Sequence, residues 1–223
     1  MLKTCFMTVL SALMLLSVAG CLLSSAPYRN VNYYDIGKPV PVSLEGIDLK
    51  VEPFVMDAPS MCKMLYRSEK CRIFVDDYNK WIQSPSLMLS VFVENAFNEN
   101  IKTDISGGLC FTLDGKITVF EIDMDSSESK LGVDYKILRT QDKKVLLQKS
   151  SIFSHKFDKI SAEVFAAAMS VAASGFVEEL KSELLVLRAG ELKNAKKKAD
   201  IASSPGEKGL KNEKTQTGTA DKR

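Results

Sequence analysis

Five cysteines and one histidine carry the most reactive side chains of this chain. A cysteine thiol can be acylated, can form a disulfide or can bind a metal ion, and the spacing of the cysteines favours one of these outcomes. Protein zinc sites use closely spaced Cys and His pairs. No Cys-x-x-Cys occurs here, and His155 is the only histidine, so the thiols are left with acylation or disulfide formation.

Cys21 ends a leader that is typical of exported proteins. Residues 1–3 carry positive charge, residues 6–18 are almost continuously apolar, and Val18-Ala19-Gly20 place small residues directly before the cysteine. This stretch is shorter than the ~20 residues that span a bilayer, but it suits a secretory signal. Its ending resembles the bacterial lipobox, at which the leader is cut and the new N-terminal cysteine is acylated. We expect lipidation of Cys21, and the alternative is an ordinary signal that leaves a free protein.

Three cysteines remain in the exported part of the chain. An oxidising compartment would allow one disulfide and leave one thiol over. Cys62 and Cys71 flank residues 67–70, which are typical of a turn, and they are the best candidates for pairing. The alternative is a core with three buried thiols, Cys110 included, that depends on no bridge.

No catalytic set of residues is found. His155 lies beside Ser154 in an alternating pattern, which favours a structural histidine over a triad member. Residues 123–128 are rich in carboxylates, but the segment lacks the glycine and glutamate of a calcium loop. No glycine-rich phosphate loop occurs. We therefore expect a protein that is not an enzyme and binds no cofactor or metal, and the net charge of +2 gives no reason to expect nucleic acid.

Trp81 is the only tryptophan and stands just before a clear helix start. It could fill the core and fix the helix to the preceding hairpin, or it could be an exposed contact for a partner protein. We favour the core position.

The first half of the chain predicts short strands followed by one helix. Residues 32–37 and 47–51 have strand-like patterns, and residues 64–66 and 73–75 face each other as a hairpin. Ser84 is a good N-cap and Pro85 suits the first helical position, so a helix should run from here to about residue 98–100.

The second half predicts longer strands and a longer helix. Strands are expected at 109–121, 131–138 and 145–153, and an apolar stripe predicts a helix from Asp158 or Ser161 to Leu187. Small residues at 166–175 would let this helix lie close to a sheet. The fold class is α+β, with a mainly antiparallel sheet built from hairpins and two helices packed on one face. Because both halves end in a helix, a diverged repeat is a further hypothesis.

The domain organisation follows from the leader and the charge distribution. We expect a signal peptide at 1–20, a lipidated tether at 21–31, one folded domain at 32–187 and a basic, disordered tail at 188–223. The tail carries ten Lys or Arg and five Asp or Glu. It could alternatively bind an anionic envelope polymer such as peptidoglycan.

Several segments, taken in order, resemble the ABC-type transport auxiliary lipoproteins, the PqiC/YmbA-like family that accompanies Mce-domain lipid transport systems. The resemblance covers about residues 21–187, and its most specific part is the Tyr-x-x-Trp-x-x-x-Pro pattern. After the lipobox it rests on Tyr33-Tyr34-Asp35-Ile36, Leu49-Lys50-Val51-Glu52-Pro53-Phe54, Leu65-Tyr66-Arg67 and Tyr78-Asn79-Lys80-Trp81-Ile82-Gln83-Ser84-Pro85.

This resemblance implies a non-enzymatic part of an envelope lipid transporter. The chain would be anchored through Cys21 and would face the periplasm. Because Leu22 rather than aspartate follows the cysteine, the outer membrane is the expected location, and the inner membrane is the alternative. Its partner would be an Mce-domain protein of the inner membrane. The resemblance also implies assembly into a homo-oligomeric ring.

Overall fold

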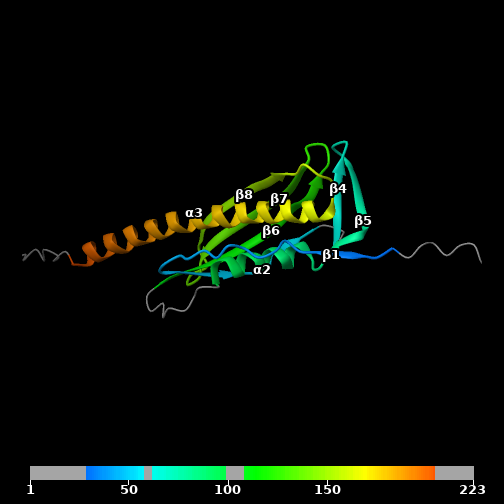
Figure 1. The fold of residues 1–223 in the computed structure, drawn as a ribbon. Coiled ribbons are helices and arrows are strands. Elements are labelled where there is room, and N and C mark those ends of the chain that lie inside the picture. Colours follow the sequence, from blue (N-terminus) through cyan, green and yellow to red (C-terminus); the bar gives the residue numbers. More distant parts are fainter. Residues whose placement is uncertain (1–28, 58–61, 99–107, 204–223) are drawn as a thin grey trace, which may run out of the picture.

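One open, mixed sheet of eight strands and two helices make up the fold in the computed structural model, which describes residues 29–57, 62–98 and 108–203 (Figure 1). The predicted α+β class is therefore confirmed. In chain order the elements are β1 (Asn32–Tyr34), β2 (Ile47–Val51), β3 (Val55–Met56), β4 (Lys63–Ser68), β5 (Arg72–Trp81), α2 (Pro85–Asn98), β6 (Leu109–Asp123), β7 (Glu128–Arg139), β8 (Val145–Lys156) and α3 (Ala162–Ser203).

Strands β6, β7 and β8 form an antiparallel meander that carries most of the sheet. The predicted strands lie where the alternation of apolar residues placed them, and β6 continues through Gly115 to Asp123. Along β7 every second side chain is buried, because one face of the meander is covered by helices. These buried residues are Leu131, Val133, Tyr135 and Ile137.

The predicted hairpin is also present as β4 and β5. Leu65 pairs with Val75 and Tyr66 with Phe74, and the chain turns through Glu69 and Lys70, which both have positive φ. The β4–β5 ladder shifts register between Lys63 and Leu65.

The sheet is mainly antiparallel, as expected, and the first three strands add short parallel ladders that the sequence did not predict. β2 and β3 pair in parallel with β6, and β1 pairs in parallel with the end of β5. β4 also meets the end of β6 in parallel. The sheet is therefore mixed, with antiparallel hairpins joined and extended by short parallel ladders.

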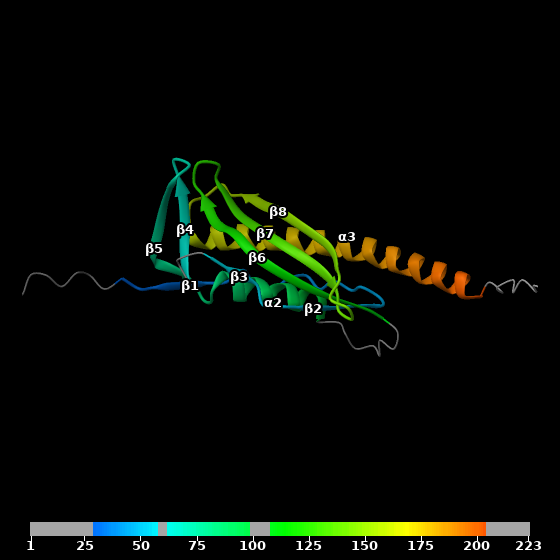
Figure 2. The same cartoon turned by 180° about the vertical axis from the view of Figure 1, so that it is seen from behind.

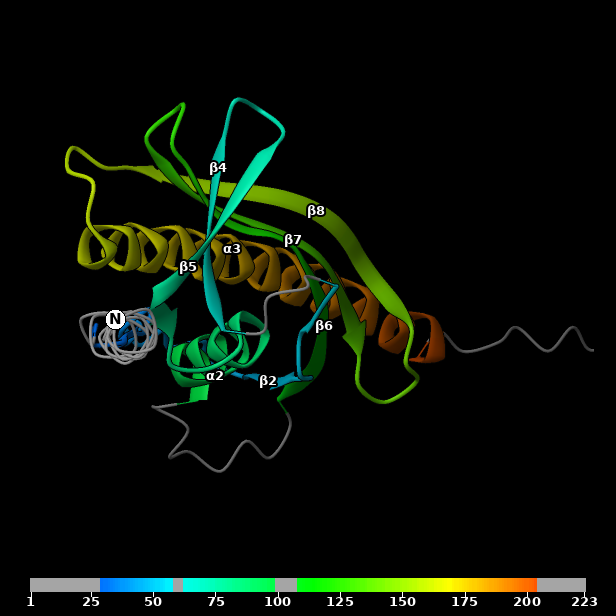
Figure 3. The same ribbon diagram turned by 90° about the vertical axis from the view of Figure 1, so that its right-hand side faces the viewer.

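Both helices begin at the predicted caps. The Ser84 side chain accepts a hydrogen bond from the backbone of Leu87 at 3.3 Å, and Ser161 caps α3 through Val164 at 3.4 Å. The sheet curves around α3, and α2 lies beside α3 on the same side (Figure 3). Gly175 of α3 lies against the Phe153 ring of β8, so the small residues do allow the close approach that was expected.

The predicted disordered tail is wrong for residues 188–203, because α3 continues without a break to Ser203. The apolar stripe ends near Leu187, but the following residues are mostly strong helix formers such as Ala, Lys and Glu. A tertiary contact also holds this part, since Arg139 of β7 forms a salt bridge with Glu191 at 2.8 Å. Residues 204–223 lie outside the described residues.

The elements give the molecule two distinct ends. β1 and the β4–β5 hairpin lie at one end, together with the first turn of α3, and α3 runs from there to project beyond the sheet at the other (Figures 1 and 2). A hairpin followed by a helix occurs twice, as β4–β5–α2 and β7–β8–α3. This shared order of elements is the only support for the hypothesis of a diverged repeat among the described residues. The parallel strands β2 and β3 of the first half have no counterpart among those of the second half.

Candidate functional site

The end of the molecule formed by β1 and β5 is the part nearest to Cys21 along the chain. Cys21 itself lies outside the described residues, which begin at Arg29. Asn32, Tyr33 and Tyr34 of β1 then pair with the last three residues of β5. Anything bound to Cys21 would therefore connect to this end through a short segment.

Trp81, the last residue of β5, is buried in the core. Only 2% of its surface is exposed, and its ring packs edge-on against Phe120 of β6 at 5.2 Å between centroids. Its backbone N–H donates to the carbonyl of Cys62 at 2.7 Å. Trp81 therefore occupies the core position, and not the exposed position that a contact with a partner protein would need.

Cys62, Cys71 and Cys110 are free thiols, and the proposed pairing of Cys62 with Cys71 is wrong in this structure. Cys62 lies beside Trp81 at the base of the hairpin, whereas Cys71 lies at the turn. The six residues of β4 separate them by about 20 Å, and a disulfide needs Cα atoms within about 7 Å. The sequence alone suggested a shorter hairpin.

A polar cluster joins the β1 and β5 end to α3. Asp76 accepts hydrogen bonds from the Tyr66 hydroxyl at 3.0 Å, from the Asn79 side chain at 2.9 Å, and from the backbone of Tyr78 and Asn79. The Tyr34 hydroxyl donates to Glu163 of α3 at 3.0 Å. These contacts fix the position of the end strands against the helix.

The electrostatics of this cluster follow from burial and hydrogen bonding. Burial alone would raise the pKa of Asp76, but the hydrogen bonds that its carboxylate accepts from Asn79, Tyr78 and Tyr66 outweigh burial and lower the pKa. Burial and the Asp76 carboxylate raise the pKa of Tyr66. Tyr66 therefore stays a neutral donor and Asp76 a charged acceptor, as a structural contact requires.

A second polar cluster lies between the meander and α3. Glu179 accepts hydrogen bonds from Tyr135 and Ser151, both at 2.7 Å, and pairs with Lys149 at 3.2 Å. These contacts together lower the pKa of Glu179 against the opposing effect of burial. Glu179 is not among the residues expected from the sequence, although a glutamate near the apolar stripe of a helix is a signal for a buried partner.

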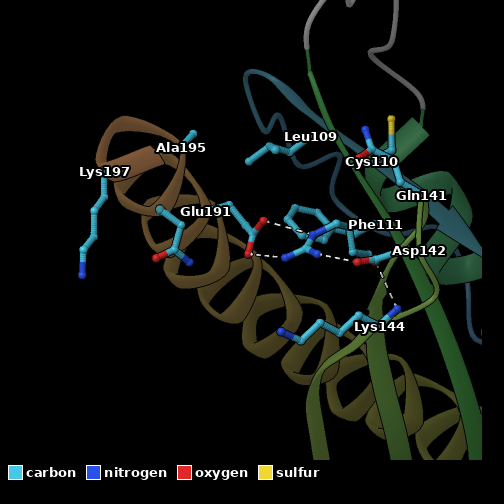
Figure 4. A pocket seen from close by; sticks show the side chains of 11 residues that line it. Leu109, Cys110, Phe111, Gln141, Asp142, Lys144, Glu191, Ala195 and Lys197 are labelled. Atoms are coloured by element: carbon cyan, nitrogen blue, oxygen red, sulfur yellow. Dashed lines mark hydrogen bonds and ion pairs between the residues drawn. The ribbon is translucent and has the colours of Figure 1, made fainter. Parts of the chain in front are cut away.

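A groove of about 670 Å³ lies where α3 leaves the sheet (Figure 4). Arg139 lies along its wall and donates to Glu191 at 2.8 Å and to Asp142 at 2.7 Å. Both carboxylates hold the guanidinium, so an anionic ligand would have to displace them. The charged lining does not suit an acyl chain. The contacts of Arg139 in this groove hold the extension of α3 to the β7–β8 turn.

The other candidate sites carry structural contacts. Asp123 pairs with Lys130 at 2.5 Å and caps the backbone of Asp125 and Ser126, so its carboxylate closes a turn. The hydrogen bond from Lys130 lowers the pKa of Asp123 to about 2. His155 is exposed. Among the described residues no three His, Cys, Asp or Glu side chains gather in a way that could hold a metal ion.

Within the same ranges, no helix is both long enough and apolar enough to cross a bilayer.

Comparisons with known proteins place the fold. No protein-family model and no curated protein sequence matches the chain. A crystal structure of a Xanthomonas campestris protein of the family DUF330 is similar with a TM-score of 0.59 and 18% identity, over 74% of this chain and 99% of that one. A second, an uncharacterized protein, has a TM-score of 0.57 and 12% identity, over 70% and 99% of the two chains. At these identities the likeness concerns the fold.

Proposed function

We propose that this chain is a lipid-anchored lipoprotein of the bacterial envelope that acts as a docking or tethering subunit of an Mce-type, ABC-driven lipid transport system. Cys21 carries the lipid, the domain faces the periplasm from the outer membrane, and the protein performs no catalysis. The partner is an Mce-domain protein, and the chain assembles with copies of itself. Support comes from the leader, from the ordered motifs and from the fold that the chain shares with a DUF330 protein.

One observation carries this proposal: the chain leaves the domain towards Cys21 at the end opposite to the one where α3 projects. A lipid on Cys21 would hold the β1 and β5 end at the membrane. The 42 residues of α3, about 63 Å of helix, then lead away from it. A domain of this shape can present its far end to a protein anchored elsewhere, and the anchor raises the local concentration of that end.

Two experiments test the proposal. Metabolic labelling with palmitate should mark the wild-type protein and leave Cys21→Ser unmarked, and the wild type should fractionate with the outer membrane. Crosslinking in cells followed by purification should recover an Mce-domain protein with the wild type. If labelled, membrane-bound protein repeatedly yields no inner-membrane lipid transport component, the docking role is refuted while the anchor stands.

A second candidate function rests on the projecting end of α3. Lys193, Lys196 and Lys197 are exposed there and follow the Arg139–Glu191 contact, so the protein could bind peptidoglycan or another anionic polymer as a stand-alone structural lipoprotein. Deletion of residues 192–223 removes this basic part and keeps the Arg139–Glu191 salt bridge. Sedimentation with purified cell wall should then be lost, and unchanged sedimentation would exclude this candidate.

A further inference from the structure

The end of the molecule nearest to Cys21 exposes a group of apolar and aromatic side chains. We call it the β5 face and define it by Tyr33, Ile73, Val75, Tyr78 and Ile82. Their exposed fractions are 61%, 47%, 45%, 44% and 59%, respectively. Apolar side chains clustered in this way on a soluble domain mark an interaction surface more often than isolated ones do.

The pairing of the strands shows which way these side chains point. Tyr66 pairs with Phe74, and the Tyr66 ring packs on Phe165 of α3, so both lie on the helix side of the hairpin. Ile73 and Val75 alternate with Phe74 and therefore point away from the helices.

Tyr34, which donates to Glu163 of α3, pairs with the buried Trp81, so the neighbouring residues Tyr33, Lys80 and Ile82 lie on the outer side. The register shift in the β4–β5 ladder reverses the alternation between Val75 and Lys80, which is why even-numbered residues of β5 point outwards here although Phe74 points inwards. Tyr78 lies on the same side as Lys80, because the Asn79 side chain between them turns inwards to Asp76.

The polar groups of the β5 face suit a lipid headgroup region. Arg29 lies over the Tyr78 ring at 5.2 Å from its centroid, and Lys80 pairs with Tyr33 across the β1–β5 ladder. Asp77, a carboxylate on this side, is paired with Lys63 at 2.9 Å. Tyrosine rings beside cationic side chains are enriched where proteins meet the membrane interface.

The length of the chain before this face decides what covers it. Residues 21–28 separate Cys21 from the described domain, and eight residues span at most about 28 Å. The chain leaves the domain at the end that β5 forms (Figure 2). A lipid on Cys21 thus keeps this face within reach of the bilayer at all times.

We propose that the β5 face rests on the surface of the bilayer that holds the lipid on Cys21. This inference depends on the anchor in the proposed function and adds the orientation of the domain. The lipid and the face together make two membrane contacts, so the domain stands with α3 pointing away from the membrane. The contact is mainly apolar and aromatic, so raising the salt concentration should leave it in place.

The test uses the lipidated full chain in vesicles of phosphatidylcholine and phosphatidylethanolamine, prepared with and without bromine on the acyl chains. Bromine quenches tryptophan fluorescence at short range. Ile82→Trp places a probe on the face, and Val186→Trp is the matched control, because Val186 is 67% exposed on α3. Val186 lies 24 residues into α3, about 36 Å along the helix from its start. Trp81 is common to both variants, and the wild type supplies its background.

We expect bromine to remove about half of the emission that the tryptophan at position 82 contributes, since an interfacial side chain lies about 5–10 Å into the headgroup and acyl boundary. The control at position 186 should keep its emission. Tyr33→Trp repeats the test if Ile82→Trp fails to fold by circular dichroism.

The outcomes distinguish a failure of the orientation from a failure of the anchor on which it rests. If the wild type does not float with the vesicles, the anchor fails, and both are overturned. If it floats and the two probes are quenched equally or not at all, the orientation alone is overturned. Should the probe at position 82 be shielded in an oligomer that mass photometry detects, a second copy covers the face, and the bilayer contact is again wrong.

Discussion

Replacing Trp81 by alanine should destabilise the domain strongly, because this ring, at the end of β5, is buried against Phe120 of β6. Only 2% of its surface is exposed, and the ring packs on Phe120 at 5.2 Å. Removing a fully buried aromatic side chain typically costs about 3–5 kcal/mol of unfolding free energy. For a domain of this size, that loss lowers Tm by about 6–20 °C.

Urea unfolding of the protein without its leader, followed by far-ultraviolet circular dichroism, measures this loss. Fluorescence cannot serve, because Trp81 is the only tryptophan. The neighbouring Ile82→Ala is the control, since Ile82 is exposed and its truncation should change the unfolding free energy by less than about 0.5 kcal/mol. If Trp81→Ala costs less than about 1 kcal/mol and instead abolishes crosslinking to a partner, our reasoning about the core is refuted.

Three further predictions concern single positions. Gly115→Ala should cost about 1–3 kcal/mol in urea unfolding, because the new Cβ would lie 2.1 Å from the Phe54 ring; an unchanged midpoint would show that the ring moves freely. Asp123, with its pKa lowered from 3.8 to about 2, should contribute about 2 kcal/mol above pH 4 and lose it towards pH 2. Asp123→Asn should therefore lower stability at pH 5 and hardly change it at pH 2, and an equal loss at both pH values would contradict the assignment. Finally, a thiol reagent should modify the exposed Cys71 before the two partly buried cysteines, as peptide mapping would reveal.

Local sequence rules predicted the elements that depend on a few neighbouring residues. Ser84 and Pro85 mark the start of α2, and the strand from Leu109 continues past Gly115 as its alternation indicated. These features follow from capping chemistry and side-chain periodicity, which act within one segment.

The remaining features depend on contacts between distant segments. β2 lies in parallel against β6 about 60 residues further along the chain, and no local pattern specifies that ladder. Leu187 seemed to end α3 because the apolar stripe ends there, yet the Arg139–Glu191 salt bridge supports a longer helix. The sequence allowed both a buried and an exposed position for Trp81, and the contact with Phe120 of β6 decides for the buried one.

The unbroken course of α3 makes it a rod whose length and rotation are linked. Each residue inserted after Leu187 would advance the far tip by about 1.5 Å and turn it by about 100°. Adding seven residues nearly restores the angular direction while moving the tip outward by about 10 Å. An insertion of seven residues therefore changes mainly the distance of the tip from the domain. An insertion of one residue changes mainly the direction in which the side chains at the tip face.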